Sequence, residues 1–252
     1  MTGDELRAQI WQTPDDRALL AVYADWLLQH DDEARGRYIH LALLPDPTPA
    51  QVTERWALFH AHVARWMGPA APHLSRPEDC LATPSFLGGA RCTAESLAAG
   101  FDAICAVSPR LVLRLAPIWQ PRARTLFWTL PLGRLYGLEL VDDDMTWVDD
   151  PLFTGALPQL HGLQHLALSI RPGALTLDGW RAISQQLTTL ASLELDLHAT
   201  TDSWLEALVD SPLTRSLRHV ALTPPHSDEL RARIEQRFAA AQLTWFDAPV
   251  PE

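Results

Sequence analysis

A leucine-rich block recurs four times in the C-terminal half of the chain at a nearly constant spacing. The four segments are LGRLYGLEL, LHGLQHLAL, LTTLASLEL and TRSLRHVAL. Their third apolar positions are Leu138, Leu166, Leu193 and Val220, which lie 28, 27 and 27 residues apart. One unit of this length cannot bury its apolar face alone, so the constant period predicts repeats that stack on their neighbours.

The segments between these blocks have the apolar spacing of helices. Thr201 and Asp202 form a capping pair before Leu205 and Leu208. Two further segments repeat apolar residues every three or four positions, namely Leu177, Trp180 and Ile183, and Leu230, Ile234 and Phe238. Alternating strands and helices predict an α/β fold, with a parallel sheet on the concave side and helices on the convex side.

Residues 87 to 247 resemble the longer, helix-containing leucine-rich repeats of the ribonuclease-inhibitor-like class. The resemblance implies a solenoid of five to seven repeats, with weaker copies at RLVLRLAP and LTWFDAP. In many such repeats an Asn amide bonds the turn backbones. This chain has no Asn there, because the corresponding residues are Asp143, Arg171, His198 and Pro225. We therefore expect a short, irregular array.

The N-terminal region reads as helical. Residues 1 to 45 predict three short helices, the first capped by Thr2 with Glu5 and the second starting with Thr13 as N-cap and Pro14 behind it. A further helix is predicted over residues 50 to 67, between two Pro-rich stretches. We expect residues 1–86 to form a helical domain that caps the open end of the repeats, and residues 87–252 to form the repeat array.

Part of this region resembles the repeat-companion domain that accompanies leucine-rich and other repeats in bacterial proteins. The matching pieces are Pro14-Asp15-Asp16, Tyr23-Ala24-Asp25-Trp26-Leu27, Arg35-Gly36 and Ile39-His40-Leu41. The family usually has Glu at the position of Arg37 and Arg at that of His40. The match covers about 35 residues, and the resemblance implies no activity.

Four residues of this motif allow two interpretations. Tyr23, Asp25, Trp26 and Arg35 could form a small recognition or catalytic site. Alternatively, they are structural, with Asp25 and Arg35 forming an ion pair and the aromatic rings packing on the next helix. We favour the structural interpretation.

Composition limits the classes of partner. The net charge is −11, so the chain repels phosphate backbones and nucleic-acid binding is disfavoured. No apolar stretch is long enough to span a membrane, and the N-terminus does not have the pattern of a signal peptide.

The three cysteines have no CxxC spacing, which favours a reducing cytoplasm over a disulfide framework or zinc ribbon. All basic residues are Arg, which predicts a high-GC bacterial genome.

Residues with catalytic or metal-binding spacing are not found. The chain carries no GxSxG, HExxH or P-loop motif, so we expect no catalytic residues, no cofactor and no metal. The Asp-rich segment VDDDMTWVDD has three contiguous acids, unlike the alternating ligands of a calcium loop. A solvated loop at the rim of the repeats is the better interpretation.

The outward-facing strand positions are the best candidates for binding, because side chains alternate along a strand. The candidate partner-binding residues on the concave face and its rim are Arg114, Glu139, His165, Glu194, Asp196, His219, Asp142, Asp143, Asp144 and Trp147. Together they predict a protein–protein interaction module that acts as an adaptor, scaffold or inhibitor-like binder. Two alternatives stay open: an accessory subunit that docks through the helical domain, and an enzyme with a site near Tyr23, Asp25 and Arg35.

Overall fold

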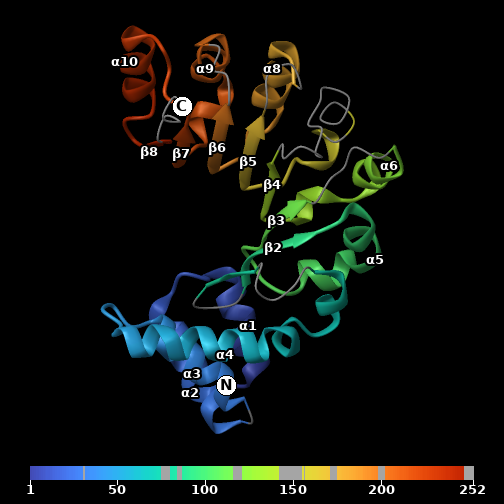
Figure 1. Ribbon diagram of the computed structural model, residues 1–252, viewed down its shortest axis with the longest axis vertical. Coiled ribbons are helices and arrows are strands. Elements are labelled where there is room, and N and C mark those ends of the chain that lie inside the picture. The colour runs from blue at the N-terminus through green and yellow to red at the C-terminus, as the bar shows by residue number, and fades with distance from the viewer. Residues whose placement is uncertain are drawn as a thin grey trace, which may run out of the picture. The chain divides into compact units, whose positions relative to one another are not determined.

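The computed structural model describes residues 1–30, 32–74, 80–83, 87–115, 121–141, 155, 157–170, 175–197 and 202–246 and shows a mixed α/β protein (Figure 1). Contacts divide the chain into two compact units. The first unit comprises Met1–Cys92 and Ala99–Leu111, and the second comprises Thr93–Ala98 and Val112–Glu252.

The first unit is built mainly from helices. They are α1 (Gly3–Gln12), α2 (Arg17–Gln29), α3 (Glu33–Ala42), α4 (Pro49–Met67) and the 3-10 helix η1 (Gly68–His73). The predicted capping box of the first helix is confirmed, because the Thr2 hydroxyl accepts from Glu5 N and the Glu5 side chain accepts from Thr2 N. The second helix starts later than predicted. Its N-cap is Asp16, whose carboxylate accepts from Ala18 N and Leu19 N at 3.0 Å each, whereas Thr13 caps the C-terminus of α1.

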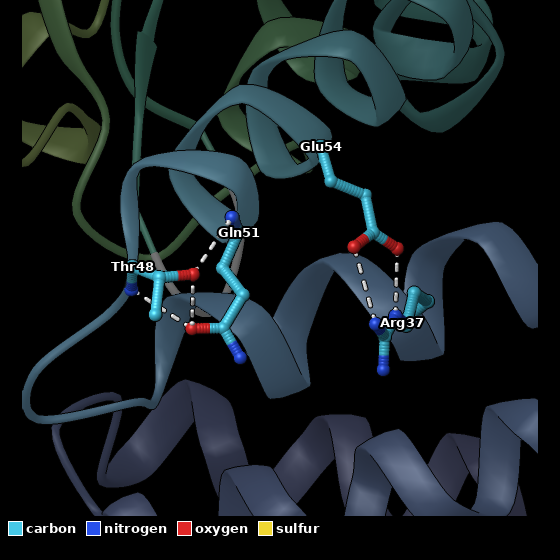
Figure 2. A network of polar contacts seen from close by, with 4 residues as sticks. All are labelled: Arg37, Thr48, Gln51 and Glu54. Atoms are coloured by element: carbon cyan, nitrogen blue, oxygen red, sulfur yellow. Dashed lines mark hydrogen bonds and ion pairs between the residues drawn. The ribbon is translucent and has the colours of Figure 1, made fainter.

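Helices α3 and α4 are joined on their solvent side by polar contacts (Figure 2). Thr48 and Gln51 form a capping box at the start of α4, with Pro49 in the first turn. One turn further on, the Arg37 guanidinium donates to both oxygens of the Glu54 carboxylate, at 2.8 and 3.1 Å. Both side chains of this pair are exposed, so it adds little stability. The buried side chains of the helices, among them Leu20, Ile39, Phe59 and Val63, hold them together.

The first unit also contains a short antiparallel pair of strands, β1 (Leu81–Ala82) and β2 (Leu87–Cys92). Helix α5 (Ala94–Cys105) follows β2 and is kinked at Gly100, where φ is −117° and ψ is 17°. A Cβ atom at Gly100 would lie 2.3 Å from the His73 ring. Glycine is therefore required at this position by close packing.

The second unit alternates strands with helices. Its strands are β3 (Val112–Leu115), β4 (Gly137–Val141), β5 (His165–Ile170), β6 (Ser192–Leu197), β7 (His219–Leu222) and β8 (Gln242–Trp245). Its helices are α6 (Pro121–Thr129), α8 (Leu177–Gln186), α9 (Asp202–Val209) and α10 (Asp228–Arg237), with 3-10 helices η3 (Leu132–Arg134), η4 (Leu157–Gln159) and η5 (Pro212–Arg215). Each strand from β4 onward pairs in parallel with its predecessor in the chain.

The strand register follows the spacing of the leucine blocks. Leu138 is paired with Leu166, Leu166 with Leu193, and Leu193 with Val220, which is the alignment that the 27-residue period predicts. These residues and their neighbours two positions on are buried, as the pattern requires. Helices α8, α9 and α10 lie side by side, on one side of β5 to β8 (Figure 1).

Trp180 anchors the contact between α8 and α9. Its ring is fully buried and stacks on Trp204, with 5.9 Å between ring centroids. Its indole N–H donates to the Trp204 carbonyl at 3.0 Å. This hydrogen bond replaces the one that the indole N–H loses to water when the ring is buried.

The structure describes only one of the four residues that stand where many such repeats have Asn, namely Pro225.

The turns before β4 and β5 approach each other very closely. A Cβ atom at Gly162 would lie 2.2 Å from the Gly133 carbonyl oxygen, and that atom belongs to backbone that cannot swing away. We predict that Gly162→Ala lowers the free energy of unfolding by about 1–3 kcal/mol because of this overlap. Thermal unfolding checks this, with Ala239→Ser at an exposed site as the control. Equal melting temperatures for the two variants would contradict the close contact.

Candidate functional site

One face of the sheet in the second unit carries the predicted binding residues. Arg114, Glu139, Ala167, Glu194 and Ala221 are successive partners across five neighbouring strands. His165 and His219 lie two positions before Ala167 and Ala221 on the same face, and Asp196 lies two positions after Glu194. The six predicted residues Arg114, Glu139, His165, Glu194, Asp196 and His219 therefore share one face. Asp142, Asp143, Asp144 and Trp147 lie outside the described residues.

The charges on this face are unevenly balanced. Arg114 forms an ion pair with Glu139, the neighbouring residue in register, which neutralises the acidic charge at that end of the face. Asp196 accepts hydrogen bonds from Ser169 Oγ at 3.4 Å and Thr223 Oγ1 at 3.3 Å. Glu194 is exposed, and within the described residues no hydrogen bond holds it. The centre of the face therefore presents the carboxylates of Glu194 and Asp196.

These carboxylates surround a shallow depression, which we call the acidic hollow. It is lined by Glu139, Ala167, Leu168, Ser169, Glu194, Asp196 and Phe246, and has a volume of about 220 Å³. Ala167 is a small lining residue that lies between Glu139 and Glu194 in the strand register. The hollow combines apolar residues with carboxylates, which suits a basic or polar protruding group.

Phe246 is a lining residue that the sequence analysis did not name as a candidate. It follows β8, and its backbone N–H donates to the Leu222 carbonyl at 2.9 Å, which continues the pairing with β7 by one residue. The segment LTWFDAP indicated a terminal strand, and alternation along it from Thr244 would have placed Phe246 on the same face as Glu194.

His165 sits between the acidic residues of the face. Its Nδ1 lies 2.9 Å from Ser192 Oγ, across the β5–β6 pairing. Burial lowers the pKa of His165, while the negative charges of Glu194 and Glu139 act in the opposite direction. The net shift is downward, so His165 is neutral at pH 7.

This shift has a consequence for stability. A lowered pKa in the folded state means that the unfolded chain binds the proton more readily, so the contribution of His165 to stability is present above the unfolded pKa and is lost as pH falls below it. We predict that the free energy of unfolding decreases from pH 7 to pH 5, and that His165→Gln weakens this dependence. Chemical denaturation at several pH values measures both, with exposed His219→Gln as the control. Identical pH dependence in the wild type and His165→Gln would contradict the shift.

The N-terminal motif residues are arranged differently from the prediction. Asp25 does not take Arg35 as its partner. It is exposed, and its Oδ1 lies 2.9 Å from His40 Nε2 on the next helix. Tyr23 is buried, and Trp26 packs between Tyr23 and His30, with 4.3 Å between the centroids of Trp26 and His30. The predicted ion pair fails because Arg35 is directed into the interior of the unit, where burial lowers its pKa.

Other chemistry is limited in the part of the chain that the structure describes. Within it, no group of three or more His, Cys, Asp and Glu side chains is placed to hold a metal ion. Burial raises the pKa of the Cys92 thiol to about 12, so Cys92 is a poor nucleophile at neutral pH. Across the same residues, no helix has the length and apolar character needed to span a membrane.

Comparisons with known proteins add no assignment. No model of a known family matches the chain, and no curated protein has a significant match to it.

Proposed function

We propose that the second unit is a short, irregular leucine-rich-repeat solenoid that binds a protein partner on its open sheet face. Three observations support the repeat architecture: the parallel strands follow one another in chain order, the leucine positions are in register, and α8 to α10 lie on one side. Such arrays typically leave the sheet face available for binding.

The observation that carries the proposal is the acidic hollow around Ala167. Glu194 and Asp196 both place carboxylates in this hollow, while Glu139 is paired with Arg114. A negative face repels nucleic acid and attracts a basic protein surface. Ser169, His165 and His219 add hydrogen-bonding groups around the carboxylates. The face therefore suits an adaptor, scaffold or inhibitor-like binder that catalyses no reaction. We propose that the protein acts in the bacterial cytoplasm.

A second candidate function is docking through the helical unit, as an accessory subunit of an enzyme or defence assembly. The observation in its favour is a set of large apolar side chains that are exposed there: Val22 at 48%, Leu28 at 41% and Trp56 at 37% of their surface. Exposed apolar residues are common singly on protein surfaces, so this support is weaker than the acidic hollow. The enzyme alternative near Tyr23, Asp25 and Arg35 has no specific observation in its favour, and Asp25 is hydrogen-bonded to His40.

A photo-crosslinking amino acid in place of Glu194 tests the proposal. We predict one protein adduct from host lysate for Glu194, and none for a control replacement of Glu235, which is exposed on α10 on the helical side. Crosslinked lysate is analysed by mass spectrometry after purification of the chain. Adducts from position 235 alone, or equal adducts from both, would contradict binding at the sheet face.

The charge of the hollow is tested separately with neutral variants of similar shape. We predict that Glu194→Gln with Asp196→Asn weakens binding of the captured partner by at least about tenfold, since two charge-assisted contacts are lost. The matched control is Glu229→Gln with Glu235→Gln, which removes the same charge from α10. Calorimetry measures the affinities, and the loss should shrink at high salt. An equal effect of both double variants would make the acidic hollow irrelevant.

A further inference from the structure

His165 stands beside the acidic hollow on the central strand β5. Ala167, which lines the hollow, follows His165 by two positions and lies on the same face of the strand. Glu139 and Glu194 are the register partners of Ala167 on the two adjacent strands. Diagonal neighbours on adjacent strands lie about 8 Å apart, a distance that long side chains can span. The charges of both carboxylates therefore act on the His165 ring.

The His165 ring is held on two sides by its neighbours in the same row. On the β6 side, its Nδ1 lies 2.9 Å from Ser192 Oγ. On the β4 side, a Cβ atom at Gly137 would lie 3.1 Å from both Cβ and Cδ2 of His165, so glycine leaves the space for the ring. Within the described residues, Nε2 has no hydrogen-bond partner, and it is not a buried unpaired atom. This nitrogen therefore reaches solvent, where a bound group can contact it.

Each neighbouring strand brings ionisable groups to the surroundings of His165. They are Arg114 on β3, Glu139 on β4, Glu194 and Asp196 on β6, and His219 on β7. Arg114 forms an ion pair with Glu139, and His219 Nδ1 lies 3.1 Å from Gln242 Oε1. Before β4, the Tyr136 carbonyl accepts from the His165 backbone N–H at 3.0 Å. Burial disfavours the protonated imidazole, whereas Glu194 and Glu139 favour it.

The neutral and the protonated imidazole present different groups to a cation. When Nδ1 of the neutral ring donates to Ser192 Oγ, Nε2 carries a lone pair that accepts a hydrogen bond. An arginine or lysine side chain held by Glu194 can donate to that lone pair. Protonation turns Nε2 into a donor and places a positive charge beside the carboxylates. The imidazolium then repels an incoming cation and compensates part of the negative charge that attracts it.

We propose that protonation of His165 is a switch that releases a cationic side chain of a protein partner from the acidic hollow. The switch rests on the binding role proposed above for the sheet face. Because burial lowers the pKa of His165 from its ordinary value of 6.5, the ring is neutral at pH 7 and the hollow is then in its binding state. Affinity falls as the pH drops below that range, and a bound cation lowers the pKa of His165 further, since proton and cation compete.

The affinity of a cationic peptide at two pH values tests the switch. The probe is acetyl-hexa-arginine amide, whose guanidinium groups stay charged at both pH values. Calorimetry with the full chain at low salt measures its binding at pH 7.5 and pH 5.0. We expect binding to be about three- to tenfold weaker at pH 5.0, because the imidazolium repels the peptide at short range. His165→Gln should remove most of this difference, whereas the control His219→Gln, on the same face, should keep it.

A titration of the wild-type chain gives a second measurement that does not depend on the folding of a variant. The imidazole NMR signal of His165 is assigned from its proximity to Ser192 and followed against pH with and without the peptide. We expect a saturating amount of peptide to lower the pKa of His165. The signal of His60, exposed on α4 of the helical unit, should titrate identically in both series.

The outcomes distinguish failure of the switch from failure of the binding role. Equal pH dependence in the wild type and His165→Gln, or a His165 titration that the peptide leaves unchanged, would overturn the switch while the binding role stands. If the peptide binds at neither pH, or if Glu194→Gln with Asp196→Asn leaves its affinity unchanged, the hollow is not a site for cations. Both proposals would then be overturned.

Discussion

The packing of leucines in register across parallel strands is the interaction on which the second unit depends. Leu138, Leu166, Leu193 and Val220 stack as neighbours and are fully or almost fully buried. Because strand side chains alternate with a period of two, a slip of one residue would move Glu139 and Glu194 into this interior and expose the leucines. The same register that buries the core therefore brings the acidic residues together on the opposite face.

This dependence explains which features could be predicted from the sequence. A constant period and strict alternation define strand register and facing, so Arg114, Glu139, His165 and Glu194 were all expected on one face, and they share it. Local capping rules were less reliable, since Asp16, rather than Thr13, caps the second helix. Both Thr and Asp are favourable N-cap residues. Which of the two caps the second helix depends on the backbone path between the helices, which places the Asp16 carboxylate beside the first backbone N–H groups of α2.

Features that join distant segments could not be read from the pattern. Asp25 pairs with His40 because α2 and α3 approach closely at Gly36, where a Cβ atom would lie 2.7 Å from the Ala24 carbonyl oxygen. A small cavity lined by Arg35, Trp66 and Val107 is likewise assembled from residues far apart in the sequence. Local periodicity does not predict such long-range contacts. The sheet face arises from repetition, whereas these contacts arise from tertiary packing.

The distance between Arg114 and Thr244 tests the stacking most directly, because five successive register pairs separate these two exposed residues. Neighbouring strands lie about 4.8 Å apart, so the Cα atoms should be separated by roughly 20–24 Å. Double electron–electron resonance between spin labels at the two positions measures this. A single narrow distribution at that distance, allowing for the label arms, is the predicted result. A broad distribution, or one centred far beyond it, would contradict a sheet stacked in the leucine register.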